Sequence, residues 1–388
     1  MEGGFEIVII GGGVIGSACA YFLQQDANFR GIIAVVEPDP TYAQAASARS
    51  ASSIRQQFST PINIALSAFG MDFLRHARDR GLPPLGLVES SYLYLATSAG
   101  RAALEARFAI QRTAGVPVQL HERAALARRY PWLNTSDLVA GTDTVGVEGW
   151  FDGYALLTSL RAANERGGVR YLRDRVVGFE HSPVSAICAV ELQGLGRVAC
   201  RHAVLAAGTR SRDLAALVGV ELPVFARKRT VCVFSCPEAL PRLPLLIDPS
   251  GLWLRSEGDR FLCGIPADPD PNVPPDDFEI DHGLFEGVAW PMLAHRVPAF
   301  EAVRQTSAWV GHYDYNVFDQ NAFVGPAPGI ANLLLACGFS GHGLQHAPGV
   351  GRGLAEHIIF GAYRTLDLSP LSYERFSRNA PLRELNVI

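Results

Sequence analysis

A glycine-rich turn close to the start of the chain has residue types and spacing that suit the binding of a dinucleotide. It contains Gly11, Gly13 and Gly16 and follows the apolar segment Ile7–Ile10. In a strand–turn–helix unit, the first glycine permits a tight turn and the second lets the backbone approach a pyrophosphate. The third lets the helix pack closely on the sheet, so that the helix N-terminus faces the phosphates. The pattern therefore predicts a nucleotide-cofactor site.

An acidic residue at the end of the next apolar stretch indicates which cofactors fit. Glu37 follows the run 32–36 and lies 21 positions after Gly16. A carboxylate there accepts hydrogen bonds from both ribose hydroxyls of an adenosine, whereas the 2′-phosphate of NADP would meet like charge. A lone glycine-rich turn has little specificity, but the flanking strands, the helix and the acid make this prediction specific. The other predicted cofactor contacts in this region are Val14, Ile15 and Pro38.

A second glycine-rich turn lies near the other end of the chain. The apolar strand 333–336 runs into the turn 338–343, more than 320 residues after the first turn, and a helix is expected to begin near Pro348. Since no internal repeat relates the two turns, they are best explained as holding opposite ends of one extended ligand. FAD fits, because amides at a helix N-terminus stabilise the negative charge that develops on a reduced flavin. An NAD-linked dehydrogenase explains the first turn equally well but leaves the second without a purpose.

Small and polar residues fill the segment 43–53, which includes Arg49 and is followed by Arg55. Small side chains would let this backbone lie against a flat ring system. An ordinary solvated loop explains the composition equally well, so the residues themselves leave both interpretations open.

The composition excludes several classes of function. The 388 residues are 48% hydrophobic and carry a net charge of −4, which suits a core of two lobes and provides no basic field for nucleic acid. No apolar run reaches the roughly 18 to 20 residues of a membrane-spanning helix, and a strand beginning by Phe5 leaves no room for a targeting peptide. We therefore expect a cytoplasmic protein without a transmembrane segment, while peripheral contact with a membrane stays open. The seven scattered cysteines and the histidines lack metal-ligand spacing, so no metal is expected.

The remaining patterns predict an α/β protein. The apolar strand 203–206 runs into Gly208 and returns the chain to the nucleotide-binding sheet, whereas several short strands separated by turns predict an antiparallel sheet. Asp152 is expected at the N-cap of a helix over 154–166. Further helices are expected at 61–80 and 101–114, and further strands at 92–97, 169–172, 175–179, 231–234, 252–255 and 260–263.

Three blocks of residues carry a family likeness: GFSGHGLQHAP (338–348), AAG (206–208) and AWVGHYDYNVFDQNAFVGP (308–326). Together they resemble the FAD-dependent D-amino-acid oxidase superfamily, on the side of the sarcosine oxidases, glycine oxidases and dimethylglycine dehydrogenases. The likeness implies a discontinuous Rossmann-like FAD-binding domain and a second, mostly antiparallel β-sheet substrate domain. The expected boundaries are 1–90, 150–225 and 320–388 for the FAD-binding domain, and 91–149 and 226–319 for the substrate domain.

By this resemblance, several segments would contact FAD. The segment 47–53 would run beside the isoalloxazine. Val176 would contact the adenine through its backbone, and the second glycine-rich turn would cover the pyrimidine edge of the flavin. The cofactor-binding residues so implied are Ser47, Arg49, Ser50, Ala51, Ser52, Ser53, Val176, Ala207, Gly208, Gly338, Phe339, Ser340, Gly341, His342, Gly343, Leu344 and Gln345.

The reaction implied by the resemblance is oxidation of a C–N bond in a small amino acid or amine, with hydride passing to flavin N5 and water hydrolysing the imine. Such chemistry needs positioning, a neutral amine and a carboxylate clamp, for which the planar fork of arginine is suited. Arg55 and Arg255 are the candidates for the clamp, although a surface ion pair explains most of the arginines in this chain. Tyr313 is a candidate to bind substrate or wall the pocket, and a core tyrosine is the alternative.

Three positions depart from the family pattern. Gln345 stands where sarcosine oxidases carry a lysine that binds the substrate carboxylate, and Leu262 stands where they carry a lysine that assists reaction with oxygen. Gly311 stands near the position of their flavin-linking cysteine, and the segment 43–53 has no histidine for such a link. We therefore expect non-covalent FAD and a dehydrogenase that passes electrons to a quinone or carrier protein.

Two segments, YDYNVFDQN (313–321) and DLSPLSYERF (367–376), are most similar to a mitochondrial member of this family known as an assembly factor for respiratory complex I. This likeness implies an alternative function, in which the flavoprotein is an assembly or interaction factor with weak or no turnover.

Overall fold

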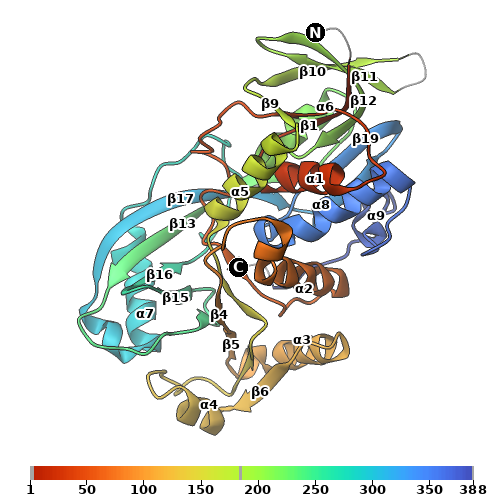
Figure 1. Ribbon diagram of the computed structural model, residues 1–388. Coiled ribbons are helices and arrows are strands. Elements are labelled where there is room, and N and C mark those ends of the chain that lie inside the picture. The colour runs from red at the N-terminus through yellow and green to blue at the C-terminus, as the bar shows by residue number, and fades with distance from the viewer. Residues whose placement is uncertain (1–3, 183–185, 387–388) are drawn as a thin grey trace.

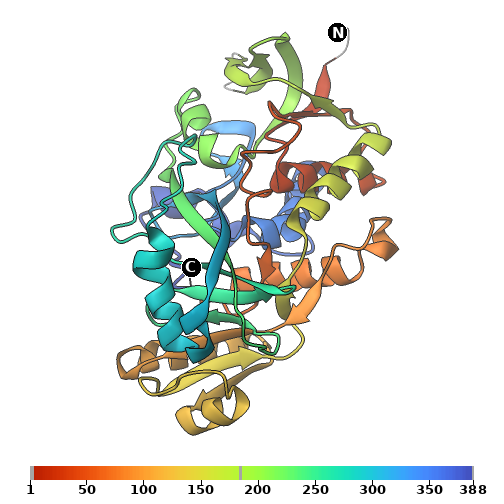
Figure 2. The ribbon, with the colours of Figure 1, turned by 90° about the vertical axis from the view of Figure 1, so that its left-hand side faces the viewer.

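The computed structural model of the protein describes residues 4–182 and 186–386. Its strands form one mixed sheet of parallel and antiparallel strands, one large and mostly antiparallel sheet, and a small three-stranded sheet (Figures 1 and 2). This arrangement confirms the expected fold class, an α/β protein with a Rossmann-like nucleotide-binding part and a second, mostly antiparallel sheet.

The first sheet has a parallel centre in the order β9-β2-β1-β12-β19, with β18 antiparallel at the edge. In β1, Ile7 and Ile9 face one core cluster while Val8 and Ile10 face another. Both faces are therefore covered, which explains why these strands are continuously apolar instead of alternating. The strands are β1 (Phe5–Ile10), β2 (Ile33–Val36), β9 (Arg170–Leu172), β12 (Gly196–Leu205), β18 (Phe323–Ala327) and β19 (Ile330–Cys337), and β10 (Val176–His181) and β11 (Ile187–Leu192) extend the sheet antiparallel from β12.

One face of this sheet is covered by a group of four helices, in which α8 contacts α1 and α2, and α1 contacts α5 (Figure 1). They are α1 (Val14–Gln25), α2 (Pro61–Arg75), α5 (Gly153–Arg166) and α8 (Gly343–Phe360). The short helix α6 (Ser211–Ala216) contributes to the core on the other face, and α9 (Glu374–Ser377) lies close to the C-terminal end. Among the described residues, the structure contains no helix with the length and apolarity to cross a membrane.

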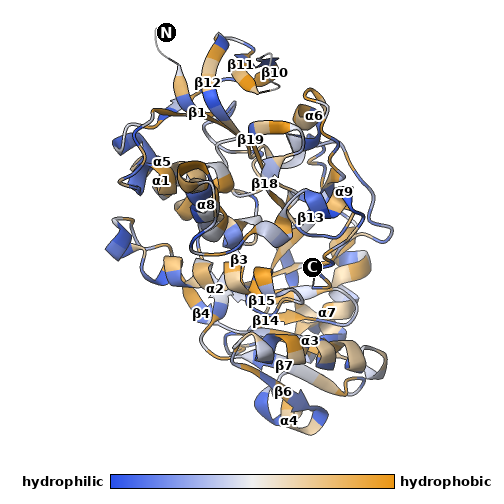
Figure 3. Cartoon of the chain, turned by 90° about the vertical axis from the view of Figure 1, so that its right-hand side faces the viewer, coloured by the Kyte–Doolittle hydropathy of each residue, from blue (hydrophilic) through white to orange (hydrophobic). Residues whose placement is uncertain are grey.

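The second sheet has the order β17-β13-β16-β15-β14-β5-β7-β6 and is antiparallel except between β14 and β5. In Figure 3 this part of the chain shows both colours: strand β14 consists of Leu and Ile, whereas α4 carries three arginines beside its apolar residues. The strands are β5 (Tyr92–Ala96), β6 (Val118–Glu122), β7 (Ala140–Thr144), β13 (Val224–Ser235), β14 (Leu245–Ile247), β15 (Trp253–Glu257), β16 (Arg260–Gly264) and β17 (Arg304–Asn316); the helices are α3 (Arg101–Thr113), α4 (Arg123–Arg129) and α7 (Trp290–Arg296).

The third sheet joins the two larger ones and contains β3 (Ser53–Ile54), β8 (Glu148–Trp150) and β4 (Val88–Ser90). Its first strand begins at the last residue of the small, polar segment 43–53, whose residues 43–52 are in neither helix nor strand. Single turns of 3-10 helix lie at Arg78–Arg80, Ser98–Gly100, Gly208–Arg210, Pro298–Ala302 and Ser369–Leu371, and Phe285–Ala289 is π-helical.

The structure confirms one predicted helix cap and corrects one predicted helix start. The Asp152 side chain accepts a hydrogen bond of 2.8 Å from the backbone N–H of Ala155, which confirms it as the N-cap of α5. The expected helix start near Pro348 is wrong, because α8 begins at Gly343 and contains Pro348 in its interior. Since the helix begins five residues earlier, its first turn comes directly after the second glycine-rich turn. The predicted domain boundaries stay a prediction.

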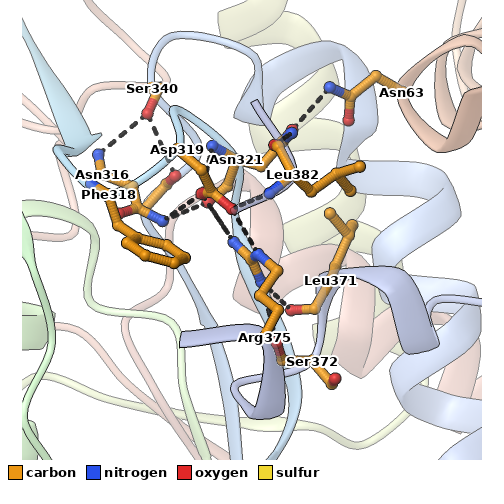
Figure 4. A network of polar contacts seen from close by, with 11 residues as sticks. Asn63, Asn316, Phe318, Asp319, Asn321, Ser340, Leu371, Ser372, Arg375 and Leu382 are labelled. Carbon is orange, nitrogen blue, oxygen red and sulfur yellow. Dashed lines mark hydrogen bonds and ion pairs between the residues drawn. The ribbon is translucent and has the colours of Figure 1, made fainter. Parts of the chain in front are cut away.

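A buried polar network ties the end of β17 to the C-terminal part of the chain (Figure 4). Arg375 donates to the carboxylate of Asp319 at 2.7 and 3.1 Å and to the backbone oxygen of Asn321 at 2.9 Å. The backbone N–H of Asn316 donates to Ser340 Oγ at 3.0 Å, so the network also reaches the second glycine-rich turn. Neither Asp319 nor Arg375 is exposed to solvent.

Replacing Arg375 with methionine should strongly destabilise the fold, because it leaves the buried carboxylate of Asp319 without its counter-ion. We expect a loss of about 3–5 kcal/mol in the free energy of unfolding, measured by chemical denaturation. The control is Arg378→Met, which removes a 70%-exposed arginine paired with Glu374 at the end of the same helix. It should cost under about 1 kcal/mol. Equal losses in the two variants would contradict the importance given to the buried pair.

Candidate functional site

An extended cavity of about 620 Å³ runs between the two glycine-rich turns. Its walls include residues from both sheets, from α1, from the start of α8 and from the loop 43–53. The structure thus brings together residues that lie more than 300 positions apart in the chain. The predicted site residues in its walls are Gly11, Gly13, Val14, Ile15, Glu37, Pro38, Ser47, Arg49, Ser50, Ala51, Ser52, Ser53, Arg55, Val176, Ala207, Gly208, Tyr313, Phe339, Gly341, Gly343, Leu344 and Gln345.

Five predicted site residues are not in these walls: Gly16, Gly338, Ser340, His342 and Arg255. The first belongs to the first turn of α1, and a Cβ atom on it would stand 2.0 Å from the backbone oxygen of Gly11. Only glycine permits so close an approach of helix and strand, so Gly16 has a packing role. The contacts of Gly338, His342 and Arg255 with neighbouring residues are described below, and Ser340 accepts the hydrogen bond from Asn316 given above.

The first glycine-rich turn leaves open space where a pyrophosphate would lie. Gly11 has a φ of +103°, and its Cβ would stand 2.3 Å from the backbone oxygen of Ala206, so this position requires glycine. At Gly13, the nearest atom to a Cβ would be Ser47 Oγ at 3.5 Å. That hydroxyl accepts a hydrogen bond of 3.1 Å from the backbone N–H of Val14, in the first turn of α1. The loop 43–53 is thereby joined to the helix N-terminus.

Glu37 lies in the cavity wall at the end of β2. Its Oε2 accepts from the backbone N–H of Gly12 at 2.9 Å, and its Oε1 accepts from that of Asp39 at 3.0 Å. Each carboxylate oxygen has a second acceptor site, so the group can still bind ribose hydroxyls. Burial raises the pKa of Glu37, although the two backbone hydrogen bonds oppose this change.

The loop 43–53 is fixed by side chains of the second sheet. The Trp309 indole N–H donates to the backbone oxygen of Arg49 at 2.9 Å, and the Arg49 guanidinium donates to that of Val310 at 2.9 Å. Arg255 donates to the backbone oxygen of Ala51 at 2.8 Å and also pairs with Glu257. Arg255 therefore supports the loop from outside the cavity wall, and its Nε has no partner among the described residues. Its clamp role stays a prediction.

The second glycine-rich turn is held by a carboxylate that the sequence interpretation missed. Asp314 follows Tyr313 in β17, and its side chain accepts from the backbone N–H of Gly338 at 2.7 Å. Burial raises the pKa of Asp314 to about 6, against hydrogen bonds from Phe339 and Gly338 that lower it. A Cβ on Gly341 would stand 2.5 Å from the Tyr313 ring, so this aromatic ring packs directly on the turn.

Arg55 brings a buried positive charge to the cavity wall. Only 5% of the residue is exposed, and its guanidinium carbon lies 4.4 Å from the centroid of the Phe58 ring. Its Nη2 contacts His342 Nε2 at 3.2 Å and donates to the backbone oxygen of Asn386. Its Nε has no hydrogen-bond partner among the described residues. Burial lowers the pKa of Arg55, but Tyr94, Tyr92 and Glu384 outweigh this effect and raise it, so the group stays charged.

Two histidines of α8 and its N-cap lie beside this arginine. The pKa of His342 is lowered well below its usual value by burial and by the charge of Arg55, and the same causes lower that of His346 to about 3. Both rings are therefore neutral, and His342 Nε2 accepts from the guanidinium, which can only donate. His342 thus acts through Arg55 and not as a wall residue.

Gln345 is largely occupied by contacts within the protein. Its Oε1 accepts from the backbone N–H of Arg55 at 2.8 Å and from the Ser67 hydroxyl at 2.9 Å. The amide oxygen therefore fixes the backbone beneath the arginine. Further wall residues that the sequence interpretation missed include Tyr92, Arg229, Leu245, Trp253, His312 and Asp314.

The cavity fits FAD better than a smaller cofactor. Its volume lies in the range of about 300–1,000 Å³ that is typical of ligand sites. Residues at the start of both α1 and α8 lie in its walls, and Glu37 lies where an adenosine ribose is expected. Within the part of the chain that the structure describes, no group of three or more His, Cys, Asp or Glu side chains could hold a metal ion.

Comparisons with known proteins agree with this geometry. A family model described as "DAO: FAD dependent oxidoreductase" matches residues 6–357. FAD-dependent oxidoreductase domain-containing protein 1 of Xenopus laevis is 39% identical over 429 residues, covering 99% of this chain and 85% of that protein. Mitochondrial dimethylglycine dehydrogenase of Homo sapiens is 26% identical over 396 residues, covering 96% of this chain and 45% of that protein.

The fold is also shared with a solved structure, that of L-proline dehydrogenase from P. horikoshii. The two have a TM-score of 0.85 at 22% sequence identity, covering 98% of this chain and 100% of the other. The predicted family and cofactor class are therefore confirmed, and the chain belongs to the DAO family of FAD-dependent oxidoreductases.

Proposed function

We propose that the protein oxidises a C–N bond of a small amino acid or amine that carries a carboxylate. When bound, FAD supplies the acceptor for the two electrons. The observation that carries the proposal is the buried charge of Arg55 at the cavity wall, with an Nε that lacks a partner. The planar guanidinium matches a carboxylate in shape and charge, and its burial strengthens that interaction.

The side chains around Arg55 suit a small substrate that is apolar apart from its carboxylate and its amine. Tyr92, Leu245 and Trp253 come from adjacent strands of the second sheet and line the same cavity. These side chains exclude water, while Gln345 and His342 fix the arginine from behind. The similarity to dimethylglycine dehydrogenase supports a substrate of the methylated amino-acid type, although this chain spans under half of that protein.

We further propose that the physiological acceptor is a quinone or a carrier protein and not oxygen. Lys228 is the only lysine in the chain, and it pairs with Asp277 at 2.9 Å outside the cavity wall. Leu262, at the position expected for an oxygen-activating lysine, is buried and also lies outside the wall. No ammonium group is therefore available to stabilise negative charge on reduced oxygen.

FAD is held without a covalent bond in this proposal. A Cβ on Gly311 would stand 2.9 Å from the backbone oxygen of Arg49, so no larger side chain fits at the position expected for a linking cysteine. None of the seven cysteines of the chain is in the cavity wall.

Anaerobic reduction of the bound flavin tests the proposed reaction. N-methyl, cyclic and D- or L-amino acids are added to the FAD-loaded protein, and loss of the visible absorbance of the oxidised flavin is followed. At least one compound with a carboxylate should bleach it. Arg55→Met should then raise the KM for that compound by a factor of about 100, the value of about 3 kcal/mol for a charged hydrogen-bonded pair.

The matched control is Arg129→Met, which removes a half-exposed arginine of α4 that pairs with Asp143 of the second sheet outside the cavity. Its KM should be unchanged. If no compound bleaches the flavin, the alternative of an assembly or interaction factor for a respiratory complex is favoured. Stable capture of a respiratory subunit by the unreactive protein would then establish that alternative.

Reoxidation of the reduced protein tests the choice of acceptor. After anaerobic reduction, the flavin should reoxidise much faster with a soluble quinone than with air-saturated buffer, because the cavity has no lysine. Stopped-flow absorbance measures both rates. Rapid release of hydrogen peroxide during turnover would show that the protein is an oxidase.

A further inference from the structure

We infer that the segment Arg383–Asn386 belongs to the substrate site and positions the guanidinium of Arg55. This inference rests on the proposed function, in which Arg55 binds a substrate carboxylate. Arg55 and this segment lie more than 300 residues apart in the chain. Two anchors hold the segment in place, one at Asp319 and one at the start of α2.

The first anchor is the buried network around Asp319 (Figure 4). The backbone N–H of Leu382 donates to Asp319 Oδ2 at 3.0 Å, and that of Glu384 donates to the backbone oxygen of Asp319 at 3.1 Å. Since Asp319 is itself paired with Arg375, this part of the segment has a rigid base.

The second anchor is the N-terminus of α2, where the Glu384 carboxylate is only 1% exposed. Its oxygens accept from the backbone N–H and the hydroxyl of Ser59 at 2.8 and 2.6 Å, and from those of Thr60 at 3.1 and 2.9 Å. Asn63, in the first turn of α2, donates to it at 3.0 Å. A carboxylate is favourable at a helix N-terminus, both for the free N–H groups and for the helix dipole.

These contacts place Asn386 against the substrate site. Its backbone N–H donates to Glu384 Oε1 at 3.0 Å, and its side-chain amide donates to the backbone oxygen of Gln57 at 2.7 Å. Its backbone oxygen accepts from Arg55 Nη2. The residue whose carbonyl receives the arginine is therefore held by its backbone N–H and by its side chain.

This carbonyl determines which N–H groups of Arg55 are left for a ligand. Nη2 carries two N–H groups. It has two partners, His342 Nε2 and the Asn386 oxygen, so both groups are used. The Nε group is without a partner among the described residues, and none of the hydrogen bonds of Arg55 to these residues involves the two N–H groups of Nη1. Without Asn386, Nη2 would have only His342 as a polar partner, and the guanidinium could turn about its long side chain.

The experiment measures binding of benzoate, a flat carboxylate, and of benzamide, its neutral isostere, to the FAD-loaded protein. Perturbation of the flavin absorbance gives both Kd values. The variants are a chain that stops after Arg383, Glu384→Ala and Asn386→Ala, which keeps the Glu384 anchor. The control is Glu374→Ala, an exposed acid of α9.

Removing residues 384 onward, or the Glu384 carboxylate, should raise the Kd for benzoate about tenfold, the effect of one charge-assisted hydrogen bond. The Kd for benzamide and the FAD content should stay unchanged, since only the guanidinium is misplaced. Asn386→Ala should give a smaller increase for benzoate, and Glu374→Ala none. If the shortened chain loses FAD, the Kd values of Glu384→Ala and Asn386→Ala for benzoate and benzamide provide the test instead.

An unchanged Kd for benzoate in the tail variants, with Arg55→Met weakening it strongly, would overturn this inference alone. Equal weakening of benzoate and benzamide would also overturn it, because the segment would then have only a structural role. If wild type does not bind benzoate, or if Arg55→Met has no effect, the proposed function fails together with the inference.

Discussion

A buried guanidinium at the wall of the cavity is the feature on which the candidate site depends. Taking the charge of Arg55 out of water is costly unless neighbouring groups stabilise it. The structure provides the faces of Phe58 and Tyr92, at 4.4 and 5.7 Å from ring centroid to guanidinium carbon, and acceptors on His342 and Asn386. These contacts keep the arginine in place and charged but leave part of its hydrogen-bonding capacity for a ligand anion.

The position of that charge is set by segments from the whole length of the chain. The loop 43–53 lies between the two large sheets and is fixed by Trp309 and Arg255 of the second sheet. The turn 338–343 is fixed by Asp314, and the C-terminal segment is fixed by Asp319 and the start of α2. The same fixed segments therefore line the cofactor cavity and hold Arg55, so a change in one of them affects both cofactor and substrate binding.

The sequence allowed the cofactor end to be predicted because its residues are adjacent in the chain. Gly11, Gly16 and Glu37 belong to one strand–turn–helix–strand unit, in which spacing determines geometry. The substrate end was harder, because Tyr92 meets Leu245 through the parallel pairing of β5 with β14, which no local pattern indicates. Arg255 has the residue type of a clamp, yet β15 places it behind the wall. The predicted helix start near Pro348 was wrong because α8 begins at Gly343 and accommodates Pro348 in its interior.

A crystal structure of the FAD-loaded protein with benzoate tests the central claim most directly. The account predicts that the carboxylate lies within hydrogen-bonding distance of Arg55, on the side away from His342 and Asn386. A carboxylate bound elsewhere in the cavity, or an Arg55 that turns to pair with an acid of the protein itself, would contradict the account.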